Sequence, residues 1–305
     1  MVLRVATCQF PVDADISRNT RYVLRQLGIA KQRGAQIAHF PECGLSGYAG
    51  SEFETYEDFD WPLLRSGMEL VLERARELKL WVILGSSHKL TGSHKPHNSS
   101  YVISAAGKVI DRYDKRFCSG DRAKKSGDLA HYSPGQHLCV FEVGGVRCGT
   151  LICYEYRFPE LYREYKRRGV QLIFHSYHAG HLTPRSLKSM QEQVGVRVRR
   201  LNPGSTLPEI TMPAAMHVAA ANNYVWISCS NTSARESCWP SFFVRPDGVI
   251  TGRLRRNTAG VLVSAVNTKR QYYDSTLAWR QRAMGGIFHS GNLVRDSRSS
   301  DRKCW

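Results

Sequence analysis

A cysteine at the end of an apolar run is the residue of this sequence that could most readily act as a nucleophile. In GTLICYEYRFPELYRE, residues 149–164, Cys153 follows a run that predicts a buried strand, and Pro159 indicates that a helix begins shortly afterwards. A helix N-terminus near the sulfur would lower the thiol pKa and present backbone N–H groups to an oxyanion. Taken alone, the segment is equally compatible with a nucleophile and with a packed core thiol.

Two charged residues also come at the ends of predicted strands. Glu42 in HFPECGLSGY follows an apolar strand and a proline, where a carboxylate can face a cleft, although a solvated turn acid is the commoner arrangement. Lys115 in VIDRYDKRF closes a strand of alternating character, where a surface lysine is commoner. Next to a thiol, such a lysine would instead stabilise the thiolate or act as an acid toward a leaving group.

These residues must be positioned by a fold that alternates strands and helices. Short β-branched or aromatic runs bounded by Gly, Pro, Asn or Asp predict strands at 3–10, 35–40, 80–88, 97–104, 107–115, 137–143, 146–154, 170–176, 224–230, 241–248 and 260–266. Periodic apolar residues and start signals predict helices at 18–33, 61–79, 158–168 and 211–223. The turn signals in SAAGKV and RPDGVI predict two hairpins. This alternation predicts an α/β domain with a mixed sheet covered by helices.

Two segments stand apart from this pattern. Residues 178–213 are the least regular and most basic interior part, which predicts a helix-containing insertion lying over a site. Residues 286–305 form a polar C-terminal extension beyond a domain at 1–285, either exposed or lying against a partner subunit.

Composition narrows the possible partners and compartment. The 305 residues carry a net charge of +17, but Lys and Arg are spread along the chain, which favours solubility or an anionic small substrate over nucleic acid. No run of about 18 apolar residues predicts a membrane helix, and the N-terminus reads as a strand rather than an export signal. Nine scattered cysteines without a CxxC pair fit neither a zinc site nor a disulfide framework, so a reducing cytoplasm is expected.

Taken together, the three chemical motifs resemble those of the nitrilase superfamily of carbon–nitrogen hydrolases. RVATCQF resembles the first strand of that family, FPECGLSGY its glutamate motif, RYDKRF its lysine motif and GTLICYEYRFPELYR its cysteine motif. AAMHVAAANNYVWISCSNTS and SFFVRPDGVITG resemble its late helix, strand and hairpin. The resemblance covers nearly the whole chain and implies a four-layer α-β-β-α sandwich.

The resemblance also implies a Glu42–Lys115–Cys153 triad that needs no metal or organic cofactor. Glu42 would act as general base and Cys153 would form a thioester with release of ammonia or an amine. Lys115, together with a backbone N–H, that of Tyr154, would stabilise the oxyanion. The family usually carries a second glutamate near a Pro-Gly turn, and here the corresponding acid is Asp128, one methylene shorter, which raises the question of whether it reaches Lys115.

The cysteine motif indicates the amidase-like or carbamoylase-like branches of the family. A nitrilase is the alternative among enzymes, and an inactive basic binding protein on the same fold is the alternative that is not an enzyme. Arg157 stands where the carbamoylase-like branch places a carboxylate-binding arginine; it could contact an anionic substrate or pair with Glu155 or Glu160 across a helix turn. The candidate pocket residues His175, Tyr177 and His178 could shape the acyl site or serve as packing groups. Relatives assemble as dimers or larger oligomers, so a homo-oligomer with residues 275–300 crossing to the neighbour is expected.

Overall fold

The protein is built around two six-stranded mixed sheets, seen in a computed structural model that describes residues 2–121 and 126–303. The last two residues of the predicted C-terminal extension lie outside the described residues. The first sheet has the order β12-β1-β2-β3-β4-β5 and consists of β1 (Leu3–Gln9), β2 (Ile37–His39), β3 (Trp81–His88), β4 (His97–Ile103), β5 (Val109–Asp114) and β12 (Gly260–Val266). The second has the order β11-β10-β9-β8-β7-β6 and consists of β6 (Val140–Val143), β7 (Val146–Ile152), β8 (Leu172–Ser176), β9 (Trp226–Ser230), β10 (Phe242–Val244) and β11 (Ile250–Arg253).

Each sheet contains a parallel centre flanked by antiparallel strands. β1, β2 and β3 pair in parallel in the first sheet, and β7, β8 and β9 pair in parallel in the second. The remaining pairs are antiparallel, as predicted for a mixed sheet. The predicted strand at 241–248 ends at Val244 because the Arg245–Gly248 turn reverses the chain into β11, and this hairpin confirms the RPDGVI signal.

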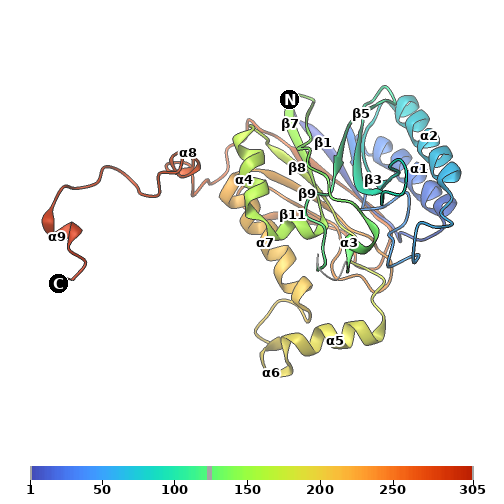
Figure 1. The fold of residues 1–305 in the computed structure, drawn as a ribbon. Coiled ribbons are helices and arrows are strands. Elements are labelled where there is room, and N and C mark those ends of the chain that lie inside the picture. Colours follow the sequence, from blue (N-terminus) through green and yellow to red (C-terminus); the bar gives the residue numbers. More distant parts are fainter. Residues whose placement is uncertain (1, 122–125, 304–305) are drawn as a thin grey trace.

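Helices cover the outer face of each sheet and complete four layers. α1 (Ile16–Gln32) and α2 (Trp61–Leu78) lie on the first sheet, and α4 (Pro159–Arg167) and α7 (Leu207–Asn223) lie on the second (Figure 1). The carboxylates of Asp15 and Asp60 accept hydrogen bonds from the first turns of α1 and α2, which explains where both helices begin. The predicted α-β-β-α sandwich is therefore confirmed.

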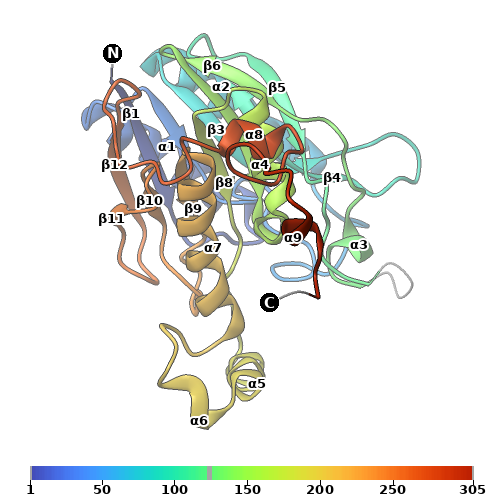
Figure 2. The same ribbon diagram turned by 90° about the vertical axis from the view of Figure 1, so that its left-hand side faces the viewer.

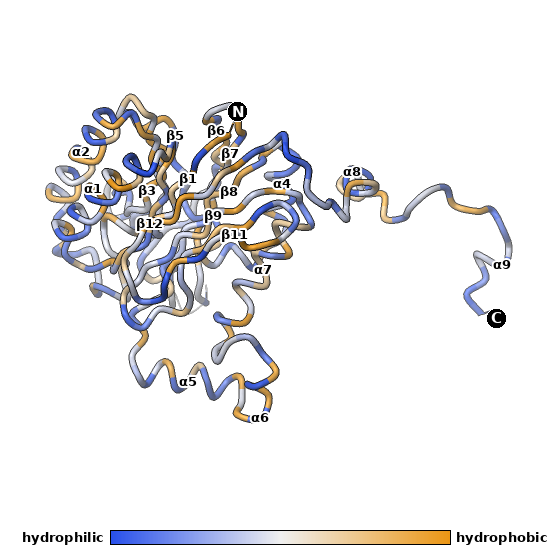
Figure 3. The backbone as a smooth tube through the Cα atoms, turned by 180° about the vertical axis from the view of Figure 1, so that it is seen from behind, coloured by the Kyte–Doolittle hydropathy of each residue, from blue (hydrophilic) through white to orange (hydrophobic). Residues whose placement is uncertain are grey.

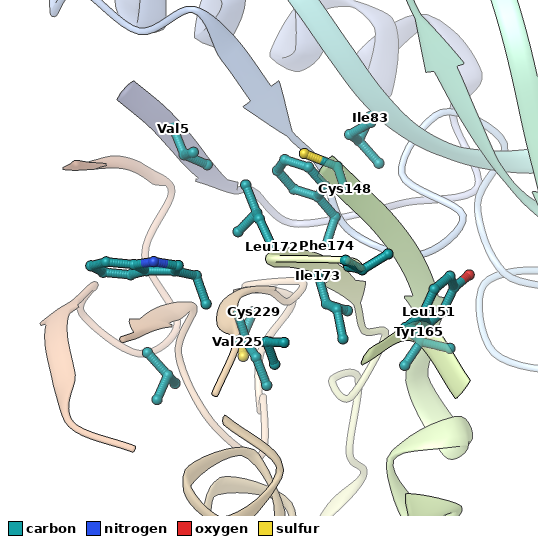
Figure 4. Packing of buried hydrophobic residues seen from close by; sticks show 14 of the residues in the cluster. Val5, Ile83, Cys148, Leu151, Tyr165, Leu172, Ile173, Phe174, Val225 and Cys229 are labelled. Atoms are coloured by element: carbon teal, nitrogen blue, oxygen red, sulfur yellow. The ribbon is translucent and has the colours of Figure 1, made fainter. Parts of the chain in front are cut away.

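Apolar side chains from both sheets form the central layer. Leu172, Phe174 and Cys148 of the second sheet lie in one cluster with Val5 and Ile83 of the first (Figure 4). A second cluster fills the space between the first sheet and its two helices. Hydrophilic and hydrophobic colours alternate along α1 and α2, as expected of helices with one buried face (Figure 3).

The predicted insertion contains helices and projects from the sandwich. α5 (Pro184–Val194) and α6 (Val196–Arg199) form an arm that leads into α7 (Figure 2). α7 begins at Leu207, earlier than predicted, because Thr206 and Glu209 form a reciprocal capping box there.

The remaining short elements lie near the site edge and in the C-terminal segment. α3 (Asp128–His131) follows the first sheet, whereas α8 (Arg280–Met284) and α9 (Ser297–Ser300) belong to a segment that leads away from the sandwich (Figure 1). None of the helices within residues 2–121 and 126–303 is both long and apolar enough to cross a membrane.

Candidate active site

Glu42, Lys115 and Cys153 lie at one end of the sandwich, where strands of both sheets have their C-terminal ends. Glu42 follows β2, Lys115 follows β5 and Cys153 follows β7. β5 runs parallel to β3 because each is antiparallel to β4, so its C-terminal end reaches the same edge as those of β2 and β3. The topology thus brings together residues that are far apart in the sequence, since Glu42 and Lys115 are 73 positions apart.

Lys115 is the charged centre of this site. Its Nζ lies 2.7 Å from Glu42 Oε1 and 2.7 Å from Asp128 Oδ2. All three side chains are buried, with exposed fractions of at most 1%. Burial alone would lower the pKa of Lys115, but the two carboxylates outweigh it and raise that pKa, so the ammonium stays protonated.

Glu42 has one oxygen held in place and one oxygen unused. Oε1 accepts hydrogen bonds from Lys115 Nζ and from Asn98 Nδ2, each at 2.7 Å. Oε2 is buried and receives no hydrogen bond from any described residue. A buried carboxylate oxygen without a donor is available to accept a proton from a reacting group.

Asn98 is a site residue that motif comparison did not identify. It lies at the start of β4, and its main-chain oxygen also accepts the Lys115 N–H at 2.8 Å. In the sequence, Asn98 is visible only as one of several successive polar residues in the strand HNSSYVI. The alternation of a strand does not show what a buried polar side chain contacts.

Cys153 occupies a tight bend between β7 and a short 3-10 helix, η1 (Cys153–Arg157). Its φ of 44° is in the left-handed region, which a non-glycine residue adopts only at an energetic cost. Tyr154 is the second residue of η1, so its N–H belongs to the first helical turn.

The electrostatics of Cys153 differ from the sequence-based expectation. Burial and the Glu42 carboxylate raise its pKa well above the usual thiol value, while Lys115 and the His178 N–H act in the opposite direction. The prediction that a helix terminus lowers the thiol pKa is therefore wrong, because loss of hydration dominates at this position. The resting group is a thiol, so a nucleophilic role for it would require a base.

Glu155 ties the lysine and cysteine motifs together, a role that the sequence did not reveal. Its fully buried carboxylate accepts hydrogen bonds from Tyr113 Oη at 2.7 Å, Arg116 N at 2.8 Å and Ile152 N at 2.7 Å. Burial raises its pKa, although these hydrogen bonds oppose the shift. One side chain thus fixes the segments on both sides of Lys115 and Cys153.

Asp128 reaches Lys115 despite its shorter side chain. α3 carries it into contact, and Ser119 N donates to its Oδ2 at 2.8 Å. The Tyr48 hydroxyl donates to its other oxygen. Burial raises the pKa of Asp128, but Lys115 and these donors lower it overall, so it is a carboxylate at neutral pH.

Arg157 lies on the surface beside two aromatic rings. Its Cζ is 4.9 Å from the ring centroid of Tyr156 and 5.9 Å from that of Tyr154. The alternative of pairing with Glu155 is wrong because that carboxylate is buried and bound elsewhere. Glu160 is exposed in the first turn of α4.

The other three predicted pocket residues lie close to Cys153. His175 Nε2 is 3.2 Å from the Cys153 carbonyl oxygen, and its ring stacks on Tyr177 with centroids 4.3 Å apart. Both side chains are fully buried, and the Tyr177 hydroxyl contacts Met216 Sδ at 3.0 Å. The His178 side chain instead forms an ion pair with Glu52, at 2.8 Å.

This arrangement is suited to nucleophilic attack on a polarised carbonyl carbon. It combines a partly buried thiol, a carboxylate with an unused oxygen and an ammonium that remains charged. Such a set can transfer a proton, form a covalent bond through sulfur and stabilise a developing negative charge.

Comparison with known proteins agrees with these features. Residues 4–272 match the family model described as carbon-nitrogen hydrolase. A nitrilase homolog 2 from Dictyostelium discoideum is 26% identical over 183 residues, which are 57% of this chain and 53% of that protein. An omega-amidase NIT2 from Xenopus tropicalis is 30% identical over 176 residues, which are 56% of this chain and 61% of that protein. The alignments thus span little more than half of the length of these relatives.

Solved structures show the same fold at lower identity. An amidase of the nitrilase superfamily from Nesterenkonia sp. AN1 superposes with a TM-score of 0.69 and 20% identity, covering 94% of this chain and 97% of that chain. Another structure of that amidase, with a TM-score of 0.67 and 19% identity, covers 87% of this chain and 90% of its own. In it, the acetamide moiety of fluoroacetamide is covalently added at the active-site cysteine.

Proposed function

Because this chain belongs to the carbon–nitrogen hydrolase family, we propose that it cleaves a linear amide or an N-carbamoyl compound through a thioester on Cys153. The observation that carries the proposal is the unused, buried Oε2 of Glu42 in a cluster where Lys115 already binds the other oxygen. The amidase relatives support the same class of reaction.

The acylation step uses the three groups in distinct roles. Cys153 Sγ bonds to the substrate carbonyl carbon while its proton passes to Glu42 Oε2. The carbonyl oxygen takes up the electron pair and is stabilised by the Lys115 ammonium and the Tyr154 N–H. When the tetrahedral species collapses, the C–N bond breaks, Glu42 returns the proton to the leaving nitrogen, and a thioester remains.

Deacylation repeats the sequence with water. Glu42 removes a proton from a water molecule while the oxygen of that water bonds to the thioester carbon. The C–S bond then breaks. The sulfur recovers the proton and the acid product leaves. Asp128 holds Lys115 in place through both steps, since its carboxylate lies 2.7 Å from Nζ.

Arg157 is proposed to contact an anionic group of the substrate. Its guanidinium is exposed and lies four residues after Cys153, and the two flanking aromatic rings orient it. For Arg157→Ala, turnover of an amide with a free carboxylate should fall more than turnover of its neutral analogue. Equal losses with both substrates would exclude carboxylate recognition.

Ammonia release from a panel of amides, N-carbamoyl amino acids and matched nitriles tests the proposed function. The wild-type protein should release ammonia from amides or N-carbamoyl compounds, and Cys153→Ala should release none. Conversion of a nitrile to the acid in preference to the amide would identify a nitrilase instead. Absence of turnover across the panel, with several thiols labelled equally by iodoacetamide, would favour a binding protein on this fold.

We also propose a homo-oligomer in a reducing compartment such as the cytoplasm. The C-terminal segment exposes large apolar side chains that a partner subunit would cover, among them Leu277, Phe288, Leu293 and Val294 with exposed fractions of 70%, 87%, 73% and 76%. The cysteines within residues 2–121 and 126–303 are all free thiols. Light scattering after size exclusion should give a mass of at least twice the 34.5 kDa of one chain.

A further inference from the structure

A buried ion pair lies beside the proposed catalytic cluster, formed by two residues outside the triad. His178 Nε2 is 2.8 Å from Glu52 Oε1, and the two side chains are only 2% and 1% exposed. Burial alone would lower the pKa of His178, but the Glu52 carboxylate outweighs it and raises that pKa. The protonated form of His178 is therefore favoured beside the Glu52 carboxylate.

Glu52 is itself held from two other directions. The main-chain N–H of Tyr48 donates to Glu52 Oε2 at 3.0 Å. The ring of His181 lies at the surface side of the pair, with Nδ1 2.9 Å from the same Oε1 that faces His178. The Glu52 carboxylate is thus held in position by contacts other than the one with His178.

The backbone of His178 connects this pair to the nucleophile. His178 follows β8, and the peptide unit that joins it to Tyr177 lies between Glu42 and Cys153. The Tyr177 carbonyl oxygen accepts the main-chain N–H of Glu42 at 3.3 Å. The N–H of the same peptide, contributed by His178, lowers the pKa of the Cys153 thiol and so favours its thiolate form.

The ring of His178 connects the pair to the lysine side of the cluster. It stacks on Tyr48 with centroids 4.8 Å apart and an interplanar angle of 21°. The Tyr48 hydroxyl donates to Asp128, which pairs with Lys115. The Lys115 Nζ also lies 6.0 Å from the centroid of the Tyr48 ring.

We propose that the Glu52–His178 ion pair is a positioning device that holds the Tyr177–His178 peptide against Cys153 and the Tyr48 ring against Asp128. The idea rests on the proposed role of Cys153 as nucleophile. Neither Glu52 nor the His178 ring touches the reacting atoms. They act through the amide that stabilises the thiolate and through the phenol that orients the partner of Lys115.

The pair explains why a buried charge is kept so close to a catalytic cluster. The ring of His178 is surrounded by Glu52, Tyr48 and the more distant charge of Glu42, and His181 faces the same carboxylate oxygen from outside. Removing Glu52 leaves the His178 ring without its partner carboxylate, and removing the His178 ring takes away the group that stacks on Tyr48. Either change therefore leaves the Tyr177–His178 peptide and the Tyr48 ring less well positioned.

The test is the pH dependence of Cys153 alkylation by iodoacetamide, followed by the mass of the peptide that contains it. Glu52→Gln and His178→Ala should slow alkylation at neutral pH about tenfold and move its midpoint upward, because one pKa unit changes the thiolate fraction tenfold. The kcat for the identified amide should fall about 10- to 100-fold with a much smaller change in KM. This is less than the roughly 100- to 1,000-fold loss on removing a direct oxyanion donor, because the pair acts through other groups.

Matched variants separate positioning from general damage. Glu54→Gln removes the same charge two residues away at an exposed position and should behave as wild type. His178→Gln keeps a donor toward Glu52 and should recover part of the alkylation rate lost in His178→Ala. Thermal melting of each variant identifies any that fails to fold. If Glu52→Gln does not fold, the alkylation rate of His178→Gln still tests the proposal.

Wild-type alkylation rates and midpoints in folded Glu52→Gln and His178→Ala would overturn the inference. A kcat loss in these variants without a change in alkylation would also overturn it, since the thiolate would then not depend on the pair. Because alkylation needs no substrate, a wild-type protein that cleaves no amide would refute the proposed function while leaving this readout intact.

Discussion

Asn98 is a residue outside the proposed triad whose side chain binds the proposed base directly. Its amide and Lys115 both bind Glu42 Oε1, which leaves Oε2 oriented for proton transfer. Asn98→Ala should reduce kcat about 10- to 100-fold with little effect on KM, because a hydrogen bond to a charged group contributes about 1.5–3 kcal/mol. Steady-state ammonia release measures both constants.

Ser100→Ala provides the matched control for this prediction. Ser100 lies two residues further along β4 on the same face, and within the described part of the chain its buried hydroxyl has no hydrogen-bond partner. Its removal should leave kcat near the wild-type value. An Asn98→Ala protein with wild-type kcat would show that the orientation of Glu42 does not depend on this amide.

Glu155 belongs to the residue scale as well, but its effect is on stability. Its carboxylate accepts hydrogen bonds from the segments that carry Lys115 and Cys153. Glu155→Gln replaces one acceptor with a donor that faces buried donors, so the free energy of unfolding should fall by about 2–4 kcal/mol. Urea denaturation followed by circular dichroism measures the change, and a loss below about 0.5 kcal/mol would contradict the bridging role.

At the scale of elements, the turn that carries Glu42 is set against the middle of β3. Leu45 N donates to Gly85 O at 2.9 Å, and a Cβ added at Gly85 would lie 2.1 Å from Pro41 O and 2.9 Å from Glu42 Cα. Only glycine allows this close approach.

Gly85→Ala should therefore displace the turn and the proposed base with it. We expect a loss of at least tenfold in kcat in a protein that still folds, since a displacement of about 1 Å can reduce catalysis a hundredfold. Gly92→Ala is a suitable control because an added Cβ there meets no atom within 4 Å, although its φ of 61° adds some strain. Retention of full activity in Gly85→Ala would show that the turn position is not critical.

The elements also show what sequence patterns can and cannot predict. Runs such as VRCGTLI and VQLIFHS identified β7 and β8 to within two residues, because apolar runs bounded by turn residues are a local signal. Glu42, Lys115 and Cys153 could be singled out from the sequence because each belongs to a recognisable motif that directly follows a predicted strand. Asn98, Glu52 and Glu155 did not, because their partners are distant in sequence and their contacts depend on sheet pairing and side-chain packing.

At the scale of the whole molecule, polar groups lie between the two sheets and make stability sensitive to acid. His39 is fully buried, with its ring nitrogens 2.9 Å from the hydroxyls of Ser228 and Ser176 in the opposite sheet. Burial lowers the pKa of His39 to about 3, whereas an unfolded histidine titrates near 6.5. The pKa of His175 is lowered as well, by burial.

Between these two pKa values the unfolded chain binds more protons than the folded one. The stabilising effect of a neutral His39 is therefore complete above about pH 6.5 and is lost progressively as the pH falls toward 3, with a slope of at most about 1.4 kcal/mol per pH unit. His39→Gln should lose about 1–2 kcal/mol less than wild type between pH 6.5 and pH 5. Urea unfolding at both pH values tests this, and identical losses in the two proteins would exclude His39 as a cause.

The central claim concerns the covalent chemistry of Cys153 and is tested most directly by one mass measurement. Wild-type protein is mixed with a saturating concentration of an amide substrate, quenched in acid during turnover and digested. The mass of the peptide that contains Cys153 is then measured by mass spectrometry. The account predicts an added mass equal to the acyl group on Cys153, and no such adduct in Glu42→Gln, which lacks the base. Steady hydrolysis with the acyl group on another residue, or undiminished turnover by Cys153→Ala, would contradict it.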